Sequence, residues 1–279
     1  MVNLRDMVAL VTGASRGVGR GIALGLGEAG ATVYVTGRTV EEGTATVALP
    51  GTIGGTAEEV SKLGGRGVAI GCDHRDDDQT RAAFDRIRAG HGRLDVLVNC
   101  AWGGYEHFYD GTEFWKEREF WTFPLSRWDR MFTAGVRSAY VCSHAAAPMM
   151  IAQQGGLIVH VSSFAAVTVA KHIGVAYGTA HATIDQLALR MAEELRPHDV
   201  AVVSLYPGLV RTEGVMKAEK HFDLSNSESP QFSGRAVAHL AVDPDRMNKS
   251  GRPLVGAELA LEYGFADIDG KQPRSLRAS

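Results

Sequence analysis

The chain has 279 residues, 45% of them hydrophobic and 22% charged, with a formal net charge of −3. This length and composition are those of an ordinary globular protein that buries a substantial core. Because there is no surplus of basic residues, the composition argues against a nucleic-acid partner. No apolar run approaches the roughly 18 residues of a membrane span, so none is expected.

Cys72, Cys100 and Cys142 are odd in number and lie far apart in the sequence. Their spacing indicates neither a disulfide framework nor a metal site. The first residues lack the pattern of a secretory signal. We therefore expect a cytoplasmic protein without a metal.

Short apolar runs alternate with stretches of helical spacing. The apolar runs predict buried strands at 7–12, 31–36, 67–72, 94–101, 156–163 and 200–208, with a last strand within 254–264. Helical spacing predicts helices at 17–29, near 56–64, 76–90 and 126–153, and at 175–196. This alternation predicts an α/β fold, in which one Rossmann-like, doubly wound parallel sheet is flanked by helices on both faces. We expect a single domain over residues 1–279.

Two insertions interrupt the alternation. Residues 39–55 are rich in Gly, Thr and Ala and are expected to form a loop after the second strand. Residues 102–128 are rich in aromatic side chains, namely Trp102, Tyr105, Phe108, Tyr109, Phe114, Trp115, Phe120, Trp121, Phe123 and Trp128. These side chains would pack over an apolar or cyclic substrate, fill a subunit interface or contact a membrane, and simple packing is the alternative. Membrane contact is disfavoured because basic residues do not dominate the segment.

A glycine-rich stretch, "TGASRGVG" at 12–19, follows the first strand and opens the first helix. Gly13, Gly17 and Gly19 permit a tight turn and a close approach of the backbone to a pyrophosphate. The N-terminus of the helix offers N–H groups and the positive end of a dipole. A plain strand-to-helix turn is the alternative, but the position at the first such junction favours dinucleotide binding.

Five motifs in order along residues 7–212 resemble the short-chain dehydrogenase/reductase family in its single-domain form. They are the glycine pattern Thr-Gly-x-x-x-Gly-x-Gly, "NCA" at 99–101, "SS" at 162–163, Tyr177, and "PGLVRT" at 207–212. "NCA" stands where the family has Asn-Asn-Ala-Gly. The stretches "RLDVLVNCAWGG" and "EYGFADIDG" are similar to a narrower branch that includes dehydrogenase/reductase member one.

The resemblance implies a catalytic, dinucleotide-binding domain that transfers a hydride between a nicotinamide cofactor and a carbonyl or alcohol substrate. It assigns Tyr177 as general acid or base and Ser163 as the group that holds the substrate oxygen, with Ser162 the lesser candidate. The residues implied to bind the cofactor are Gly13, Ser15, Arg16, Gly17, Val18, Gly19, Arg38, Asp73, His74, Asn99, Ala101, Tyr177, His181, Pro207, Gly208, Val210 and Thr212.

The cofactor type follows from the residues after the second strand. In folds of this kind an acidic residue there binds the ribose hydroxyls of NAD. Here Gly37 and Arg38 occupy the position, so no acid repels a 2′-phosphate, and Arg38 and Arg16 are suited to bind one. NADP(H) is therefore favoured, with NAD(H) the alternative.

Two positions depart from the family pattern. His181 replaces the lysine that lowers the tyrosine pKa and binds the ribose, and it brings no permanent charge. Gly135 stands where the family often has asparagine. Two functions remain open: an NADP(H)-dependent reductase or dehydrogenase with a modified relay, or a weakly active or inactive NADP(H)-binding sensor or partner subunit. The enzyme is favoured because Tyr177 and a serine are retained.

Self-association is also expected. The predicted helices at 126–153 and 175–196 are rich in small and apolar residues, and the family commonly pairs these two helices across a two-fold axis. We expect a homodimer or homotetramer. Burial of both helices against the sheet is the alternative explanation.

Overall fold

The computed structural model describes residues 2–104, 119–169 and 173–277. Seven strands form one sheet in the order β3-β2-β1-β4-β5-β6-β7, and every pairing is parallel. The strands are β1 (Val8–Val11), β2 (Thr32–Gly37), β3 (Arg66–Gly71), β4 (Val96–Asn99), β5 (Gly156–Val161), β6 (Val200–Tyr206) and β7 (Pro253–Val255). The direction of the strand order reverses beside β1, so the predicted doubly wound parallel sheet is confirmed.

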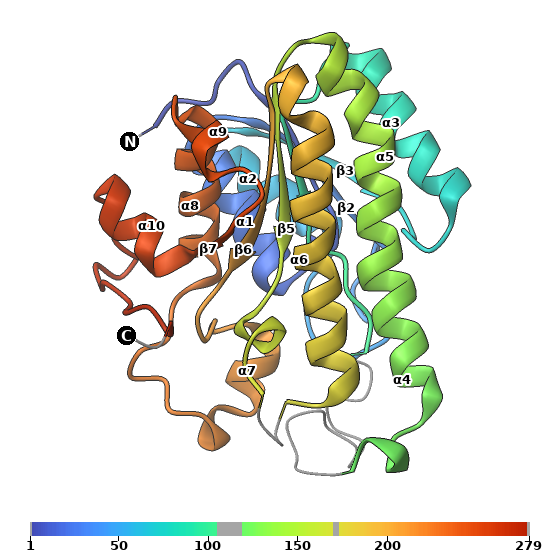
Figure 1. Ribbon diagram of the computed structural model, residues 1–279, viewed down its shortest axis with the longest axis vertical. Helices are drawn as coiled ribbons and strands as arrows, with labels where there is room; N and C mark the ends of the chain where they lie inside the picture. Colours follow the sequence, from blue (N-terminus) through green and yellow to red (C-terminus); the bar gives the residue numbers. More distant parts are fainter. Residues whose placement is uncertain (1, 105–118, 170–172, 278–279) are drawn as a thin grey trace.

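Helices cover both faces of the sheet (Figure 1). One face packs against α1 (Gly17–Glu28), α2 (Ile53–Lys62), α8 (Pro230–Val242) and α10 (Gly256–Tyr263). The other face packs against α3 (Asp77–His91), α5 (Ser138–Ala152) and α6 (Val175–Leu195). Shorter helices are α4 (Leu125–Arg130), α7 (Glu213–Lys217) and α9 (Arg246–Lys249).

Strand β1 shows why its sequence is continuously apolar. Ala9 and Val11 belong to the hydrophobic cluster beneath α1 and α8, whereas Val8 and Leu10 belong to the cluster beneath α3, α5 and α6. All four side chains are buried. A strand covered on both faces needs apolar residues at every position, and each fully buried large side chain contributes roughly 1.5–3 kcal/mol.

Glycines allow α1 and α8 to approach with their backbones almost in contact. A Cβ atom added at Gly25 would lie 2.5 Å from the carbonyl carbon of Gly234, and one added at Gly21 would lie 2.1 Å from the carbonyl carbon of Pro230. Neither position has room for a methyl group. This close packing fixes α1, whose N-terminus faces the cleft described below.

The prediction of a last strand within 254–264 was mostly wrong. Only Pro253–Val255 pairs with β6, and Gly256–Tyr263 forms α10. The apolar residues Ala257, Leu259 and Ala260 have helical spacing and face the core, and Gly264 ends the helix with a φ of 71°. Because the three strand residues lead directly into the helix, the apolar run 254–264 does not show the helical spacing when it is treated as a single strand.

The structure also differs from the prediction in the bounds of one loop, in the make-up of one helix and in an additional helix. Thr52 caps α2 by accepting the N–H of Gly55, so the loop predicted for 39–55 ends earlier. The helix predicted near 126–153 contains a π-helical segment, Met131–Arg137, between α4 and α5. Helix α8 was not predicted, although Ser229 at its N-cap and Pro230 at its first position are a typical start signal.

Within the described ranges, no helix combines the length and apolarity that crossing a bilayer requires.

We predict that Gly25→Ala destabilises the protein by on the order of 3 kcal/mol, because overpacking two touching backbones forces α1 and α8 apart. Gly54→Ala is the matched control: it also lies in a helix, and the nearest atom to its added Cβ is 3.9 Å away. The control should be neutral or slightly stabilising. Urea denaturation of both variants measures the difference, and equal stabilities would contradict the packing argument.

Candidate active site

A cleft of about 480 Å³ opens at the carboxyl ends of the strands. In an open α/β sheet this edge, where the strand order reverses, is the usual place of a ligand site. The structure brings all the sequence-predicted site residues to this cleft. Those that line it are Gly13, Ser15, Arg16, Gly17, Val18, Gly19, Arg38, Asp73, His74, Asn99, Ala101, Ser162, Ser163, Tyr177, His181, Pro207, Gly208, Val210 and Thr212.

The glycine-rich turn after β1 is held against the end of β4. The hydroxyl oxygen of Thr12 accepts the N–H groups of Cys100 and Ala101 at 2.9 and 3.0 Å. Gly13 has a φ of 64°, and a Cβ there would lie 2.6 Å from the α-carbon of Ala101. The turn therefore requires glycine for both its conformation and its close approach.

The N-terminus of α1 points into the cleft through the second and third glycines. Gly17 begins the helix with a φ of 59°, and a Cβ at Gly19 would lie 2.5 Å from the carbonyl oxygen of Gly13. The carboxylate of Glu213 accepts the N–H of Gly17 at 2.8 Å and so ties α7 to this turn. Glu213 was missed in the sequence, although it follows Thr212 directly.

Arg16 and Arg38 have different surroundings. The guanidinium of Arg16 donates to the carbonyl oxygens of Pro50 and Gly51 at 3.0 and 2.8 Å, so it holds the loop after β2 against the cleft. Arg38 is exposed at the end of β2, where its guanidinium donates to the hydroxyl of Thr46 at 3.5 Å. Arg16 thus shapes the wall of the cleft, and Arg38 presents charge to it.

Asp73 and His74 follow β3, and both side chains are engaged within the protein. The Asp73 carboxylate forms an ion pair with Arg75 at 2.5 Å, and this hydrogen-bonded guanidinium lowers the pKa of Asp73. His74 is buried with its Nε2 2.8 Å from the hydroxyl of Thr36, and burial lowers the pKa of His74 to about 4. The His74 ring therefore serves the core in its neutral form.

Asn99 lies at the end of β4, where its amide nitrogen donates to the hydroxyl of Ser143 at 3.0 Å. Its carbonyl oxygen is buried and has no hydrogen-bond partner in the described part of the chain. No group of three or more His, Cys, Asp or Glu side chains within residues 2–104, 119–169 and 173–277 is arranged to hold a metal ion.

The two serines after β5 differ in their partners. Ser162 is buried and donates to the backbone carbonyl of His181 at 3.3 Å, so it anchors α6 to the sheet. Ser163 is half-buried, and its oxygen accepts the N–H of Ala165 at 3.2 Å, which leaves its hydroxyl hydrogen for another acceptor. This difference favours Ser163 as the serine that faces a substrate.

Tyr177 and His181 lie one turn apart on α6 and meet edge-on, with 4.5 Å between ring centroids. Trp102, immediately after the "NCA" motif, stacks on the His181 ring at 4.5 Å. Burial lowers the pKa of His181 to about 3, so its imidazole is neutral at physiological pH. The position that carries a cation in the family pattern is therefore uncharged in this fold.

Gly135 lies in the π-helical segment, next to Trp102. Its carbonyl oxygen accepts the hydroxyl of Ser138 at 3.1 Å. A signal for this arrangement was present in the sequence, because Trp102 stands where the family motif ends in glycine. Because the indole of Trp102 is large, the residue that packs against it must be small.

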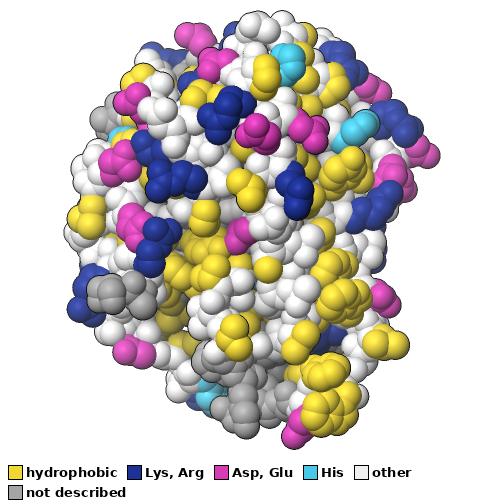
Figure 2. All heavy atoms as spheres, in the orientation of Figure 1, with side chains coloured by type: hydrophobic (Ala, Val, Ile, Leu, Met, Phe, Trp, Pro, Cys, Tyr) yellow, Lys and Arg dark blue, Asp and Glu magenta, His cyan; other side chains and the backbone are white. Residues whose placement is uncertain are grey.

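The aromatic insertion divides into two described parts. Trp102 lines the cleft, whereas Phe120, Trp121 and Trp128 are 60%, 72% and 41% exposed near α4. Figure 2 shows hydrophobic side chains gathered at the lower right, over the end of the molecule where α4 lies in Figure 1. The remaining predicted aromatic positions from 105 to 118 lie outside the described residues.

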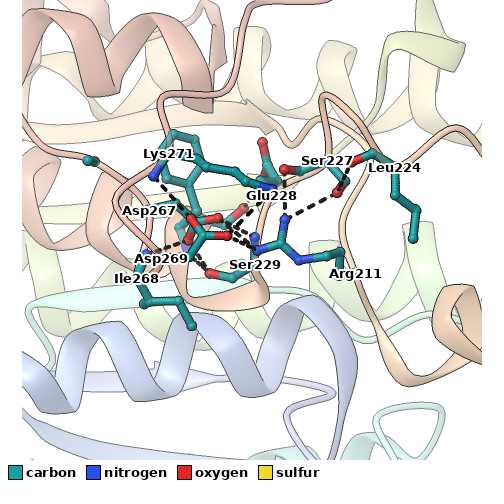
Figure 3. A network of polar contacts seen from close by, with 12 residues as sticks. Arg211, Leu224, Ser227, Glu228, Ser229, Asp267, Ile268, Asp269 and Lys271 are labelled. Atoms are coloured by element: carbon teal, nitrogen blue, oxygen red, sulfur yellow. Dashed lines mark hydrogen bonds and ion pairs between the residues drawn. The ribbon is translucent and has the colours of Figure 1, made fainter.

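A partly buried polar network supports the loop after β6 (Figure 3). Arg211 forms ion pairs with Asp267 at 3.3 Å and Asp269 at 3.0 Å, so the "EYGFADIDG" segment is fastened to the "PGLVRT" motif. Glu228 lies in this network beneath Gly208, and burial raises the pKa of Glu228 to about 7. The sequence predicted Gly208 but gave no role to Arg211 or Glu228.

The parallel sheet, the glycine turn and the convergent Ser, Tyr and His side chains define the class of dinucleotide-binding α/β oxidoreductases. The family model described as short chain dehydrogenase matches residues 7–222. The chain is 41% identical over 283 residues to "Dehydrogenase/reductase SDR family member 1" of Mus musculus, covering 96% of this chain and 85% of that protein. The chain therefore belongs to the short-chain dehydrogenase/reductase family, and the expected branch is confirmed.

Solved structures agree with this assignment. A short-chain type dehydrogenase/reductase from Mycobacterium marinum is 27% identical, with a TM-score of 0.75 over 91% of this chain and 94% of that one. A 7α-hydroxysteroid dehydrogenase complexed with NADH and 7-oxo glycochenodeoxycholic acid is 24% identical, with a TM-score of 0.74 over 98% and 97% of the two chains. The second likeness shows the fold alone. Members of the family bind nicotinamide cofactors.

We predict that Glu228→Gln stabilises the protein at pH 8 more than at pH 5. Burial raises the carboxyl pKa from its ordinary 4.5 to about 7. Between these values the folded state keeps a proton that the unfolded state has lost, so stability falls as pH rises. The full difference is on the order of 3 kcal/mol, since one pKa unit corresponds to about 1.4 kcal/mol. Thermal unfolding across this range measures it, and a pH-independent difference would contradict the assignment.

Proposed function

We propose that the protein is an NADP(H)-dependent oxidoreductase that transfers a hydride between its cofactor and a carbonyl or alcohol substrate. The observation that carries this proposal is the convergence of Tyr177, Ser163 and His181 with the glycine turn in one cleft. Family membership supports hydride chemistry.

The residues in the cleft fit a dinucleotide. The α1 amides at Val18 and Gly19 suit the pyrophosphate, because the start of a helix favours negative charge. The ring nitrogens of His181 and the carbonyl oxygen of Asn99 are buried and have no partner among the described residues, and a ribose hydroxyl and an amide or hydroxyl of the cofactor would satisfy them. Pro207 and Gly208 would border the nicotinamide.

The bound cofactor supplies or accepts the hydride. Tyr177 donates its phenolic proton to the substrate oxygen when a carbonyl is reduced, and it takes the proton from the alcohol in the opposite direction. The Ser163 hydroxyl donates to the same oxygen and holds it next to Tyr177. Since His181 is neutral, tyrosinate formation receives no help from a fixed charge there, so alcohol oxidation, which needs tyrosinate as the base, should require a higher pH than it would with a lysine at this position.

Arg38 determines the proposed preference for NADP(H). It is exposed at the end of β2, beside the part of the cleft lined by Asp73 and His74. A guanidinium at this place suits a 2′-phosphate. Arg16 is engaged with the loop carbonyls and is assigned to the shape of the pocket.

A second candidate function is an NADP(H)-binding protein with little turnover, acting as a sensor or partner subunit. The neutral His181 is the observation that favours it, because the usual charge beside the tyrosine is missing. Cofactor binding without turnover of any carbonyl or alcohol would support this candidate. We give it second place because Tyr177 and Ser163 both line the cleft.

The proposed substrate is a small carbonyl or alcohol compound with apolar or cyclic character, since Trp102 and Phe222 contribute to the cleft wall. A cytoplasmic location and assembly as a homodimer or homotetramer remain parts of the proposal. The location is supported by the three free cysteines, and the assembly by the alanine-rich sequences of α5 and α6.

Tyr177→Phe should lower kcat for carbonyl reduction by about a hundredfold or more, because the proton donor is lost. NADPH affinity should change little. Initial-rate kinetics and calorimetric titration give the two values. Tyr140→Phe, which changes an exposed tyrosine on α5, is the control. Unchanged turnover in Tyr177→Phe would show that another group moves the proton.

Arg38→Asp should weaken NADPH binding by about 2–4 kcal/mol, since a charge-assisted pair is replaced by repulsion. NADH binding should change much less. Arg81→Asp makes the same charge change on α3, away from the cleft, where Arg81 pairs with Asp78. Titration of both cofactors decides the matter: equal losses for NADPH and NADH would assign Arg38 a structural role.

A further inference from the structure

The rings of Trp102, Tyr177 and His181 make three mutual contacts. It stacks on the imidazole of His181 with 4.5 Å between centroids and 10° between planes. Tyr177 meets the indole edge-on at 5.8 Å, and Tyr177 meets His181 at 4.5 Å with 74° between planes. Each ring therefore touches both others, and displacement of one disturbs the remaining pair.

Gly135 provides the space that the indole occupies. A Cβ added at Gly135 would lie 2.6 Å from Cε3 and 2.7 Å from Cζ3 of Trp102. Real Cβ atoms do not approach ring atoms so closely, so a side chain at 135 requires the indole to move. The large residue at 102 and the glycine at 135 are thus one steric feature.

His181 lacks the hydrogen bond that usually orients an imidazole. Both of its ring nitrogens are buried and have no partner among the described residues, and the side chain is only 5% exposed. In most sites a bond to one ring nitrogen fixes the tautomer and the orientation of the ring. Here the face-to-face stack on Trp102 is the contact that sets the plane of the ring.

We propose that Trp102 is a positioning residue, which holds the His181 imidazole in the plane where a ring nitrogen meets the cofactor ribose beside Tyr177. Gly135 is required because it admits the indole. The identity of the ligand rests on the proposed function. Trp102 acts on cofactor binding through His181, and Gly135 acts through Trp102.

A double-mutant cycle tests the path through His181. NADPH dissociation constants are measured calorimetrically for wild type, Trp102→Leu, His181→Ala and the double variant. Trp102→Leu and His181→Ala should each weaken binding about tenfold, the order of one lost hydrogen bond. The double variant should bind no more weakly than His181→Ala. A further tenfold loss in the double variant would overturn the proposal, because Trp102 would then act independently of His181.

A second perturbation leaves the indole in the chain. Gly135→Ala should weaken NADPH binding as Trp102→Leu does, and it should add nothing in a Trp102→Leu background, where its Cβ meets no indole. Trp128→Leu is the control, since this tryptophan stacks on Phe132 and not on the three-ring cluster. If Gly135→Ala binds NADPH normally, the steric part of the proposal is wrong, and this variant also serves if Trp102→Leu fails to fold.

A readout without cofactor separates this inference from the proposed function. Proton NMR should show the carbon-bound ring protons of His181 shifted upfield in the wild type, because they lie over the face of the indole, and this shift should be lost in Trp102→Leu and reduced in Gly135→Ala. Trp102→Phe keeps a stacking ring and should retain part of the upfield shift. His181 ring protons without an upfield shift in the wild type would overturn the positioning role even if NADPH binds. If NADPH does not bind the wild type, the proposed function fails, and the NMR result still decides whether Trp102 orients His181.

Discussion

The hydroxyl of Thr12 joins the ends of β1 and β4, and the cleft is built around this junction. Its oxygen accepts two amides, at Cys100 and Ala101, while Gly13 presses against the α-carbon of Ala101. These contacts lie where the strand order reverses, so the segments that follow β1 and β4 diverge to opposite sides. The junction therefore sets the floor of the cleft and aims α1 into it. A larger residue at Gly13 would separate the two strand ends and remove the turn.

At position 181 on α6, burial disfavours a charged side chain. Position 181 is almost fully enclosed, and Ser162 fastens its backbone carbonyl to β5. An ammonium group in such a place loses its hydration, whereas an imidazole remains neutral and gains an aromatic contact with Trp102. His181 therefore supplies a packed aromatic ring at the position where a lysine would supply a fixed charge. The resulting enzyme would keep the geometry of proton transfer with a weaker electrostatic drive toward tyrosinate.

Local sequence signals were sufficient for the parallel sheet, because apolar runs that end in Gly or Asn mark buried strands. Most of the predicted residues that line the cleft were implied by the resemblance to the family. Residues as distant as Gly13 and Thr212 share one site because the carboxyl ends of parallel strands meet at one edge of the sheet. Helix α10 was missed because three residues of strand precede it without a break in the apolar run. Long-range contacts were also beyond the sequence. The bond from Glu213 to Gly17, the burial of Glu228 and the stack of Trp102 on His181 join segments whose proximity depends on the folded backbone.

The central claim is that this cleft passes a hydride directly between a nicotinamide and a carbon that bears oxygen. The most direct measurement uses NADPH deuterated at the transferable position of the reduced nicotinamide, incubated with the wild-type protein and a panel of apolar and cyclic carbonyl compounds. Mass spectrometry should find one added deuterium in the product, and NMR should place it on the new carbinol carbon. If NADPH binds in the cleft but no compound acquires deuterium from it, the protein does not carry out this reaction and the claim is wrong.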